Sequence, residues 1–289
     1  MKQAEYWHKI DGGAECELCP HRCRLADGQQ GICRSRICKD GALWSLVYAH
    51  PCALAVDPVE KKPLNHFMPG TKCLSIACGG CNLRCRFCQN REISQNVETG
   101  TECWSAENVV NVCLKGGWPS IAYTYTEPLT WWEYTHDIAE IARRRGLKNI
   151  LVTAGYLNPE PLRALAPLID AANVDLKFID DEAYRKICGA AVEPVQETLR
   201  MLRDVGTELE ITNLVIPGYN DSEEQLTALC KWLVDNGFRD TPLHFSRFFP
   251  AWKMQDVPMT PVATLKLARK VALSAGIKHI HLGNVPGLA

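Results

Sequence analysis

The sequence predicts an α/β fold in which a parallel sheet forms an open, partial barrel behind a small cysteine-rich N-terminal region. Short apolar runs alternate with amphipathic stretches from Lys72 onward, and glycines follow several of the amphipathic stretches. Cysteines cluster before and at the start of this alternation. The alternation gives six or seven repeats, which favours an open barrel over a closed eight-fold one.

Seven apolar runs have the length and composition of buried strands: 73–77, 120–124, 149–153, 172–177, 209–216, 243–248 and 279–282. Six amphipathic stretches predict the helices between them: 105–115, 129–145, 160–169, 195–205, 223–236 and 262–275. Gly146, Gly206, Gly237 and Gly276 stand where C-terminal helix caps are expected. Strands alternating with helices form parallel sheets, whose functional groups gather at the carboxyl ends of the strands.

The chain divides into three predicted regions. Residues 1–45 form a cysteine-rich region with little apolar periodicity, which a bound metal would have to stabilise. Residues 46–71 are rich in proline and turn residues and predict a structured connector. Residues 72–289 form the barrel domain.

Composition excludes some classes of function. The 32 basic and 33 acidic residues give a formal net charge of −1, which disfavours a nucleic-acid partner. No apolar run approaches the roughly 20 residues that span a bilayer, and the N-terminus has no signal-like apolar segment, so we expect a cytoplasmic protein. In a reducing compartment, the 15 cysteines point to metal binding or redox chemistry.

The central cysteine motif is C-x3-C-x2-C, formed by Cys81, Cys85 and Cys88 directly after the first predicted strand. Thiolates at this spacing can converge on one inorganic cluster. Three ligands on a four-iron cube leave one iron open for a small molecule, whereas structural zinc requires four ligands. Cys78 could supply a fourth thiolate, but we expect it to end the strand and face the core.

This spacing, with an aromatic residue before the third cysteine, resembles the signature of the radical S-adenosylmethionine (SAM) superfamily. The segments 60–64, 87–90 and 283–287 together look like the AmmeMemoRadiSam-system radical SAM enzymes, relatives of the pyruvate formate-lyase activating enzymes. The N-terminal segment 16–23, with 31–33, is similar to the same group. That group often continues into a further cysteine-containing tail, whereas this sequence stops at Ala289, so we expect the tail's function to be absent or supplied differently.

The resemblance implies a partial (β/α)6-type TIM barrel that holds a [4Fe–4S] cluster on Cys81, Cys85 and Cys88. SAM bound at this cluster would be cleaved reductively to a 5′-deoxyadenosyl radical, which abstracts hydrogen from a substrate. A flavodoxin- or ferredoxin-like donor would supply the electron. Likeness to activating enzymes implies a protein or peptide substrate. Two alternatives stay open: modification of a small molecule or an RNA base, and a non-enzymatic iron–sulfur or zinc electron-transfer protein.

Candidate SAM contacts follow from the resemblance. In the superfamily the end of the second strand contacts the SAM amino group, which here implicates Thr126 and Glu127. Thr126 as the cap of the next helix is the alternative. Thr153, at the end of the third strand, is the corresponding candidate in the next loop.

The remaining candidates lie on later strands. Asp175 and Lys177 alternate to one face of the fourth strand, where Asp175 could reach the ribose hydroxyls and Lys177 a carboxylate or the substrate. A structural ion pair is the alternative. Asn213 resembles the family's adenine-side loop region, and His244 and Asn284 complete a polar rim.

A second cysteine motif lies near the N-terminus. Cys16, Cys19, Cys23 and Cys33 give C-x2-C-x3-C-x9-C, a spacing that suits zinc or an auxiliary iron–sulfur cluster. Cys38 or His21 could replace one of the four. The sequence leaves the choice of metal open.

Overall fold

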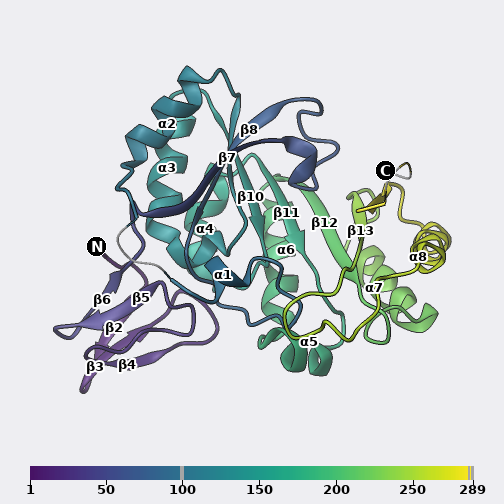
Figure 1. The fold of residues 1–289 in the computed structure, drawn as a ribbon, viewed down its shortest axis with the longest axis horizontal. Helices are drawn as coiled ribbons and strands as arrows, with labels where there is room; N and C mark the ends of the chain where they lie inside the picture. The colour runs from purple at the N-terminus through teal and green to yellow at the C-terminus, as the bar shows by residue number, and fades with distance from the viewer. Residues whose placement is uncertain (98–100, 286, 288–289) are drawn as a thin grey trace.

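The computed structural model describes residues 1–97, 101–285 and 287. Its N-terminal region consists of two three-stranded antiparallel sheets beside the main body of the molecule (Figure 1). Their strands, in spatial order, are β1 (Lys2–Gln3), β6 (Ala42–Ser45) and β5 (Arg36–Lys39), then β2 (Trp7–Ile10), β3 (Gly13–Cys16) and β4 (Arg24–Ala26).

An eight-stranded sheet forms the main body, in the order β14-β13-β12-β11-β10-β9-β8-β7. Neighbours from β8 to β14 are parallel, and β7 pairs antiparallel with β8 at one edge. The strands are β7 (Pro51–Pro58), β8 (Lys72–Cys78), β9 (Ser120–Tyr123), β10 (Lys148–Thr153), β11 (Ala171–Asp175), β12 (Glu208–Val215), β13 (Leu243–Arg247) and β14 (Ile280–Gly283). Among the described strands β14 pairs with β13 and not with β8, so the barrel is open.

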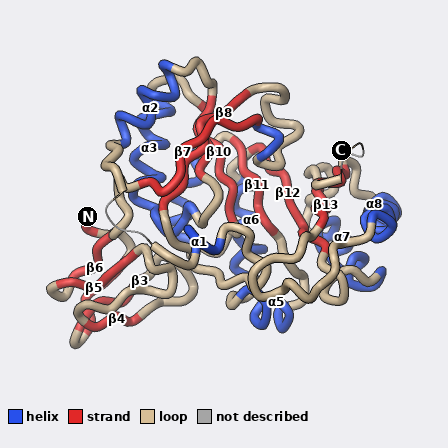
Figure 2. The backbone as a smooth tube through the Cα atoms, viewed as in Figure 1, coloured by secondary structure: helices blue, strands red, loops and turns tan. Residues whose placement is uncertain are grey.

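Helices alternate with the parallel strands, and Figure 2 shows α2, α3, α7 and α8 around the strands. They are α1 (Arg91–Ser94), α2 (Ala106–Lys115), α3 (Trp132–Arg144), α4 (Pro159–Leu165), α5 (Asp181–Cys188), α6 (Glu193–Asp204), α7 (Glu223–Asp235) and α8 (Val262–Ala275). Short 3-10 turns are η1 (Val59–Lys61), η2 (Pro128–Trp131) and η3 (Ala166–Leu168). None of the described helices has the length and apolar character needed to cross a bilayer.

Local sequence explains where these helices begin and end. Ser222 and Gln225 form a capping box that starts α7, because each side chain bonds the other's backbone. Asp180 caps α5 by accepting from the Ala183 amide. Gly189 and Gly276 end α5 and α8 in the left-handed conformation that glycine adopts without steric cost.

The segment 59–67, here called the plug, fills the barrel interior at the amino-terminal ends of the strands. Val59 and Leu64 pack with inward-facing residues of β8 to β11, in a separate small apolar cluster. Asn173 Nδ2 on β11 donates to the Pro63 carbonyl at 2.8 Å. The plug therefore closes one end of the barrel, and the residues at the other strand ends remain available for a cavity.

The predicted open α/β barrel is confirmed, and its seven parallel strands lie within one or two residues of the predicted runs. The sequence pattern did not predict β7, which lies inside the expected connector 46–71 and extends the sheet. It also did not predict the six short N-terminal strands or helices α1 and α5. Strands of two to four residues are too short to show a repeating apolar pattern. Pro286 and Ala289, which belong to the expected C-terminal motif and chain end, lie outside the described residues.

Candidate active site

A cavity of about 450 Å³ lies at the carboxyl ends of the parallel strands. Its lining residues follow strands across the sheet, from Thr124 after β9 to Ser246 on β13 and Asn284 after β14. Lys62 and Pro63 of the plug also reach it. The cavity is thus where the sequence analysis expected functional side chains.

All three cysteines of the C-x3-C-x2-C motif line this cavity. Their loop is anchored by backbone hydrogen bonds to the end of α5, from Arg84 N to Cys188 O at 2.7 Å and from Arg86 N to Ile187 O at 2.9 Å. Cys78 is fully buried at the end of β8 and is not among the lining residues, so the cavity receives three thiols of this motif.

The surroundings of these thiols fit an iron–sulfur cluster. Burial raises the pKa of Cys81 well above its usual value and also raises the pKa of Cys88. A hydrogen bond from Cys188 lowers the pKa of Cys85, against burial and with help from Lys177. Buried thiolates are costly without a compensating cation, which ligated iron supplies.

One buried polar atom in the cavity also points to a bound molecule. Thr212 Oγ1 on β12 has no hydrogen-bond partner among the described residues, although it is buried. Buried hydroxyl groups nearly always have a hydrogen-bond partner, so a polar ligand in the cavity would supply the partner that Thr212 Oγ1 lacks. The cavity volume is within the range of small-molecule sites.

Thr126 and Glu127 lie together beside the cysteine loop. Thr126 Oγ1 donates to the Cys78 carbonyl at 2.6 Å. Glu127, not Thr126, caps the following turn by accepting from Leu129 N. Its carboxylate also accepts from Thr153 Oγ1 at 2.6 Å and from Ala154 N at 2.7 Å.

These contacts define what Glu127 can do. Burial raises its pKa, although its three donors oppose that effect. The carboxylate ties the ends of β9 and β10 together, and its Oε2, with one of these donors, keeps capacity for a further one. Glu127 and Thr153 are therefore joined by a hydrogen bond, and both line the cavity together with Thr126.

Asp175 and Lys177 both line the cavity and form an ion pair, with Lys177 Nζ 2.7 Å from Asp175 Oδ2. Burial alone would lower the pKa of Lys177, but the negative charges of Asp175 and the Cys85 thiolate raise it well above its usual value. The predicted shared face of the two side chains and the alternative ion pair are thus both present.

Two predicted candidates lie elsewhere. Asn213 faces away from the cavity and donates to the Leu176 carbonyl at 2.7 Å, while Thr212 and Leu214 of the same strand line the cavity. His244 lies two residues before Ser246 on β13 and bonds Glu210, so it is nearer the plug end. The sequence did not reveal which face of the sheet each side chain points to, or how far along the strand it lies. A polar residue near a strand end can point to either face.

A charged network at the cavity floor was missed as a site. The Asp57 carboxylate accepts from Lys61, Lys62, Ser75 and Tyr125. Lys62 and Tyr125 line the cavity. The only sequence signal was the family-like segment 60–64, which carries the lysines but gives no sign of their common partner.

The N-terminal cysteines Cys16, Cys19, Cys23 and Cys33 line one small cavity. His21 lines it as well, whereas Cys38 does not. Burial, with neighbouring Cys16 and Cys33, raises the pKa of Cys19. Four thiols around one small space fit zinc or a cluster.

This N-terminal cavity is adjacent to the central cysteine loop. The Cys81 amide donates to the Cys33 carbonyl at 3.2 Å, which joins the two cysteine motifs through one backbone hydrogen bond. His21 Nε2 lies 2.8 Å from the Asn82 carbonyl oxygen. Each motif therefore helps to position the other.

Comparison with known proteins agrees with this geometry. A family model described as the radical SAM superfamily matches residues 75–230, more than half of the chain. A Methanocaldococcus jannaschii protein named uncharacterized protein MJ0808 is 43% identical over 99% of this chain and 86% of its own length. The pyruvate formate-lyase-activating enzyme of Clostridium pasteurianum is 26% identical over 52% of this chain and 64% of its own length.

Solved structures show the same fold. A radical SAM methyltransferase from Sphaerobacter thermophilus superimposes with a TM-score of 0.60 and 16% identity, covering 76% of this chain and 68% of that one. A domain of a pyruvate-formate lyase-activating enzyme from Bacteroides vulgatus gives 0.50 and 15%, covering 56% of this chain and 98% of that domain. The chain therefore belongs to the radical SAM superfamily, is related to the pyruvate formate-lyase activating enzymes, and has the [4Fe–4S] cluster and SAM as its cofactors.

Proposed function

We propose that this radical SAM enzyme acts on a protein or peptide, in the manner of the glycyl-radical activating enzymes. The convergence of Cys81, Cys85 and Cys88 on one strand-end cavity is the observation that carries the proposed site. The bound cluster and SAM supply the radical that takes hydrogen from a substrate, with an electron from an external donor.

The side chains have separate tasks in this proposal. Cys81, Cys85 and Cys88 hold the cluster, and Cys188 keeps the Cys85 thiolate hydrogen-bonded. Glu127 and Thr126 face the SAM ammonium, for which Glu127 Oε2 has acceptor capacity. These residues hold the reactants in place, and position matters more than proton transfer in such chemistry.

Lys177 and Asp175 would each bind a different polar group of SAM or the substrate. Lys177 stays protonated because of its acidic and thiolate neighbours, so it can bind a carboxylate. The Asp175 carboxylate, with its side chain 37% exposed, keeps acceptor capacity for hydroxyl groups. Thr212 Oγ1 offers a further bond. Asn284, at the rim, lines the same space.

The protein or peptide substrate is supported by relatives. Besides the activating enzyme above, the isethionate sulfite-lyase activating enzyme of Nitratidesulfovibrio vulgaris is 30% identical over 36% of this chain and 34% of its own length. The segments 60–64 and 87–90 also support the narrower assignment to the AmmeMemoRadiSam-system group.

The N-terminal cysteines would hold a second metal, either zinc or an auxiliary cluster. Their four thiols surround one cavity, and the Arg36 guanidinium lies 3.7 Å from the Cys16 sulfur.

The reaction class is tested by anaerobic reconstitution with iron and sulfide, followed by reduction in the presence of SAM. We expect 5′-deoxyadenosine from the wild type and only background amounts from Cys81→Ser, Cys85→Ser and Cys88→Ser. Cys103→Ser, at an exposed cysteine, is the matched control and should retain formation. Equal product from all four variants would contradict the assigned ligands.

The substrate class is tested by deuterium transfer. Candidate protein partners labelled with deuterium at glycine Cα should pass the label into 5′-deoxyadenosine when mixed with the reduced enzyme and SAM. Transfer from a labelled small molecule or RNA, with none from any protein or peptide, would replace the proposal with the corresponding alternative.

A further inference from the structure

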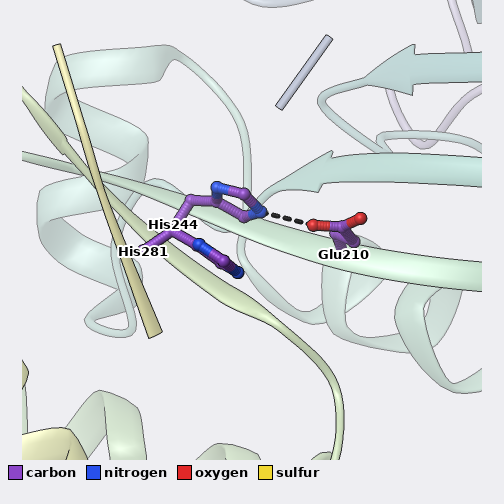
Figure 3. Close-up of side chains that lie close together, drawn as sticks. All are labelled: Glu210, His244 and His281. Carbon is purple, nitrogen blue, oxygen red and sulfur yellow. Dashed lines mark hydrogen bonds and ion pairs between the residues drawn. The ribbon is translucent and has the colours of Figure 1, made fainter. Parts of the chain in front are cut away.

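A second group of ligating side chains lies on the last three strands, on the plug side of the cavity. Glu210 on β12, His244 on β13 and His281 on β14 come together there, as Figure 3 shows. The potential ligand atoms of these three residues all lie within 4.8 Å of one another. None of the three lines the cysteine cavity.

Strand register holds this group in place. His244 and His281 are paired residues on neighbouring parallel strands, and Thr212, two residues after Glu210, pairs with His244. The two imidazole rings stack, with centroids 4.8 Å apart. Because all three residues stand on strands, their backbone is already fixed, as a binding site requires.

The plug supplies a fourth potential ligand, the imidazole of His66. His66 Nε2 lies 2.9 Å from His281 Nε2, and the His66 amide donates to Glu210 Oε1 at 2.8 Å. The other carboxylate oxygen, Oε2, lies 2.6 Å from His244 Nε2. Glu210 is thus oriented by a backbone donor, as metal-binding carboxylates commonly are.

We propose that Glu210, His244, His281 and His66 form a zinc site that links the plug to β14. Three imidazoles and one carboxylate are ligands that zinc accepts in tetrahedral geometry.

The required adjustment is small. Metal–ligand bonds of about 2.0–2.1 Å place tetrahedral ligand atoms roughly 3.3 Å apart, so the widest contact among Glu210, His244 and His281 must close by at most about 1.5 Å. Side-chain rotation within the group can supply this. Glu210 and His244 are buried, while His66 is exposed and provides an entry path from solvent.

The position explains what such a metal would do. The plug follows β7, at one edge of the open sheet, and β14 is the other edge. A metal shared by His66 and His281 would connect these two ends of the sheet across the barrel. Lys62 and Pro63, three or four residues before His66, line the cysteine cavity, so the same metal would steady the cavity floor.

The test measures zinc bound per chain by the full-length, cluster-loaded protein after equilibration with Zn²⁺ and removal of the excess. We expect His281→Gln and His244→Gln each to bind one equivalent less than the wild type. Their affinity should fall by more than the roughly 10- to 100-fold that loss of an outer partner costs. Zn²⁺ should raise the melting temperature of the wild type by about 5 °C at saturation and leave these variants unchanged.

Two controls make the result specific. His279→Gln removes an imidazole that packs on His66 but does not belong to the ligand set, so it should bind zinc as the wild type does. Cys16→Ser should lose only metal held by the N-terminal cysteines. If His244→Gln fails to fold, His281→Gln decides, because His281 is only half-buried.

The opposite results are equally clear. Identical zinc content in the wild type, His281→Gln and His279→Gln would show that the group is an ion pair and a set of stacked rings, with no metal. Equal loss in all histidine variants would point to general misfolding and would also overturn the site.

Discussion

At the scale of single residues, Asp57 holds several side chains of the cavity floor in place. Its carboxylate bonds the buried Lys62 at 2.7 Å and Ser75 at 2.8 Å. Lys62 is 1% exposed, so its ammonium has exchanged water for this carboxylate. Burial raises the pKa of Asp57, but the donors around it, led by Lys61 and Lys62, outweigh burial and keep the pKa well below its usual value.

Replacing this carboxylate should be costly. Asp57→Asn leaves the Lys62 ammonium buried without its counter-charge, and breaking such a pair costs about 3–5 kcal/mol in the free energy of unfolding. Denaturant unfolding measures the loss. The control is Asp235→Asn, which breaks the exposed pair between Lys231 and Asp235 and should cost no more than about 1 kcal/mol. Equal losses in the two variants would refute a special role for Asp57.

How far the sequence predicted the site depends on how local each signal is. The C-x3-C-x2-C spacing fixes three thiols within one short loop, and all three line the cavity. Asp57 and Tyr125 form a hydrogen bond although they are 68 residues apart in the sequence, and no local sequence pattern predicts such a contact. His244 was expected at the rim but bonds Glu210 near the plug, since sequence gives a strand's direction without the depth of each side chain.

At the scale of elements, the central cysteine loop packs closely on the N-terminal region. Gly80 adopts φ +104°, and a Cβ there would lie 2.3 Å from Ser35 Oγ and 2.5 Å from the Cys33 carbonyl. Both contacts are too short to exist. Glycine at this position is therefore what lets the loop approach the second cysteine motif.

Gly80→Ala should separate these elements. We expect lower thermal stability, and less iron retained per chain after reconstitution, because the loop must shift away from Cys33. Gly117→Ala is the matched control: its φ is also positive, at +68°, but a Cβ there meets nothing within 4 Å. It should show only the backbone cost of about 1–2 kcal/mol. A Gly80→Ala protein with the stability of Gly117→Ala and full iron content would argue against this packing.

The N-terminal region also docks on α3 through Asp137. Its Oδ2 accepts from Lys2 Nζ at 2.6 Å and from Tyr48 Oη at 2.5 Å. Burial acts to raise the pKa of Asp137, but hydrogen bonds from His136, Lys2 and Tyr48 outweigh it and lower the pKa to about 2.

This shift predicts a pH dependence. A carboxyl with a depressed folded-state pKa contributes stability that is complete above its unfolded value, near 4, and is lost as pH falls toward 2. Wild type should therefore lose up to about 1 kcal/mol more than Asp137→Asn between pH 6 and pH 3. Urea unfolding at both pH values measures it, and parallel losses would contradict the docking role.

Elements were predictable in proportion to their length and periodicity. The barrel strands are buried apolar runs, and their helices have caps, so both appear in the sequence. β7 was missed because it ends in Asp57-Pro58 and lies among turn residues. A strand at a sheet edge tolerates proline, so composition alone suggested a connector.

At the scale of the whole molecule, the N-terminal sheets and the barrel share one hydrophobic core. Ala14 and Leu43 of the N-terminal strands belong to the same buried cluster as Trp132 of α3 and Leu151 of β10. Two regions with one core are expected to unfold in a single transition. Metal at the N-terminal cysteines would then stabilise the entire chain.

Cys19→Ser tests this coupling. Removing one proposed ligand should lower the melting temperature of the whole protein, in one transition seen equally by calorimetry and tryptophan fluorescence. Cys103→Ser, at an exposed cysteine, should leave the melting temperature within experimental error. Two separate transitions, with only the earlier one shifted by Cys19→Ser, would show that the regions fold independently.

The anchoring of the central cysteine loop has a consequence for handling the protein in air. Backbone bonds to the end of α5, and one from the Lys253 amide to the Arg86 carbonyl, hold the loop independently of its three thiols. Loss of the iron through oxygen damage would then leave the polypeptide folded, with its thiols close to the positions in which they bind the cluster. Repair should need only fresh iron, sulfide and a thiol reductant, with no refolding step.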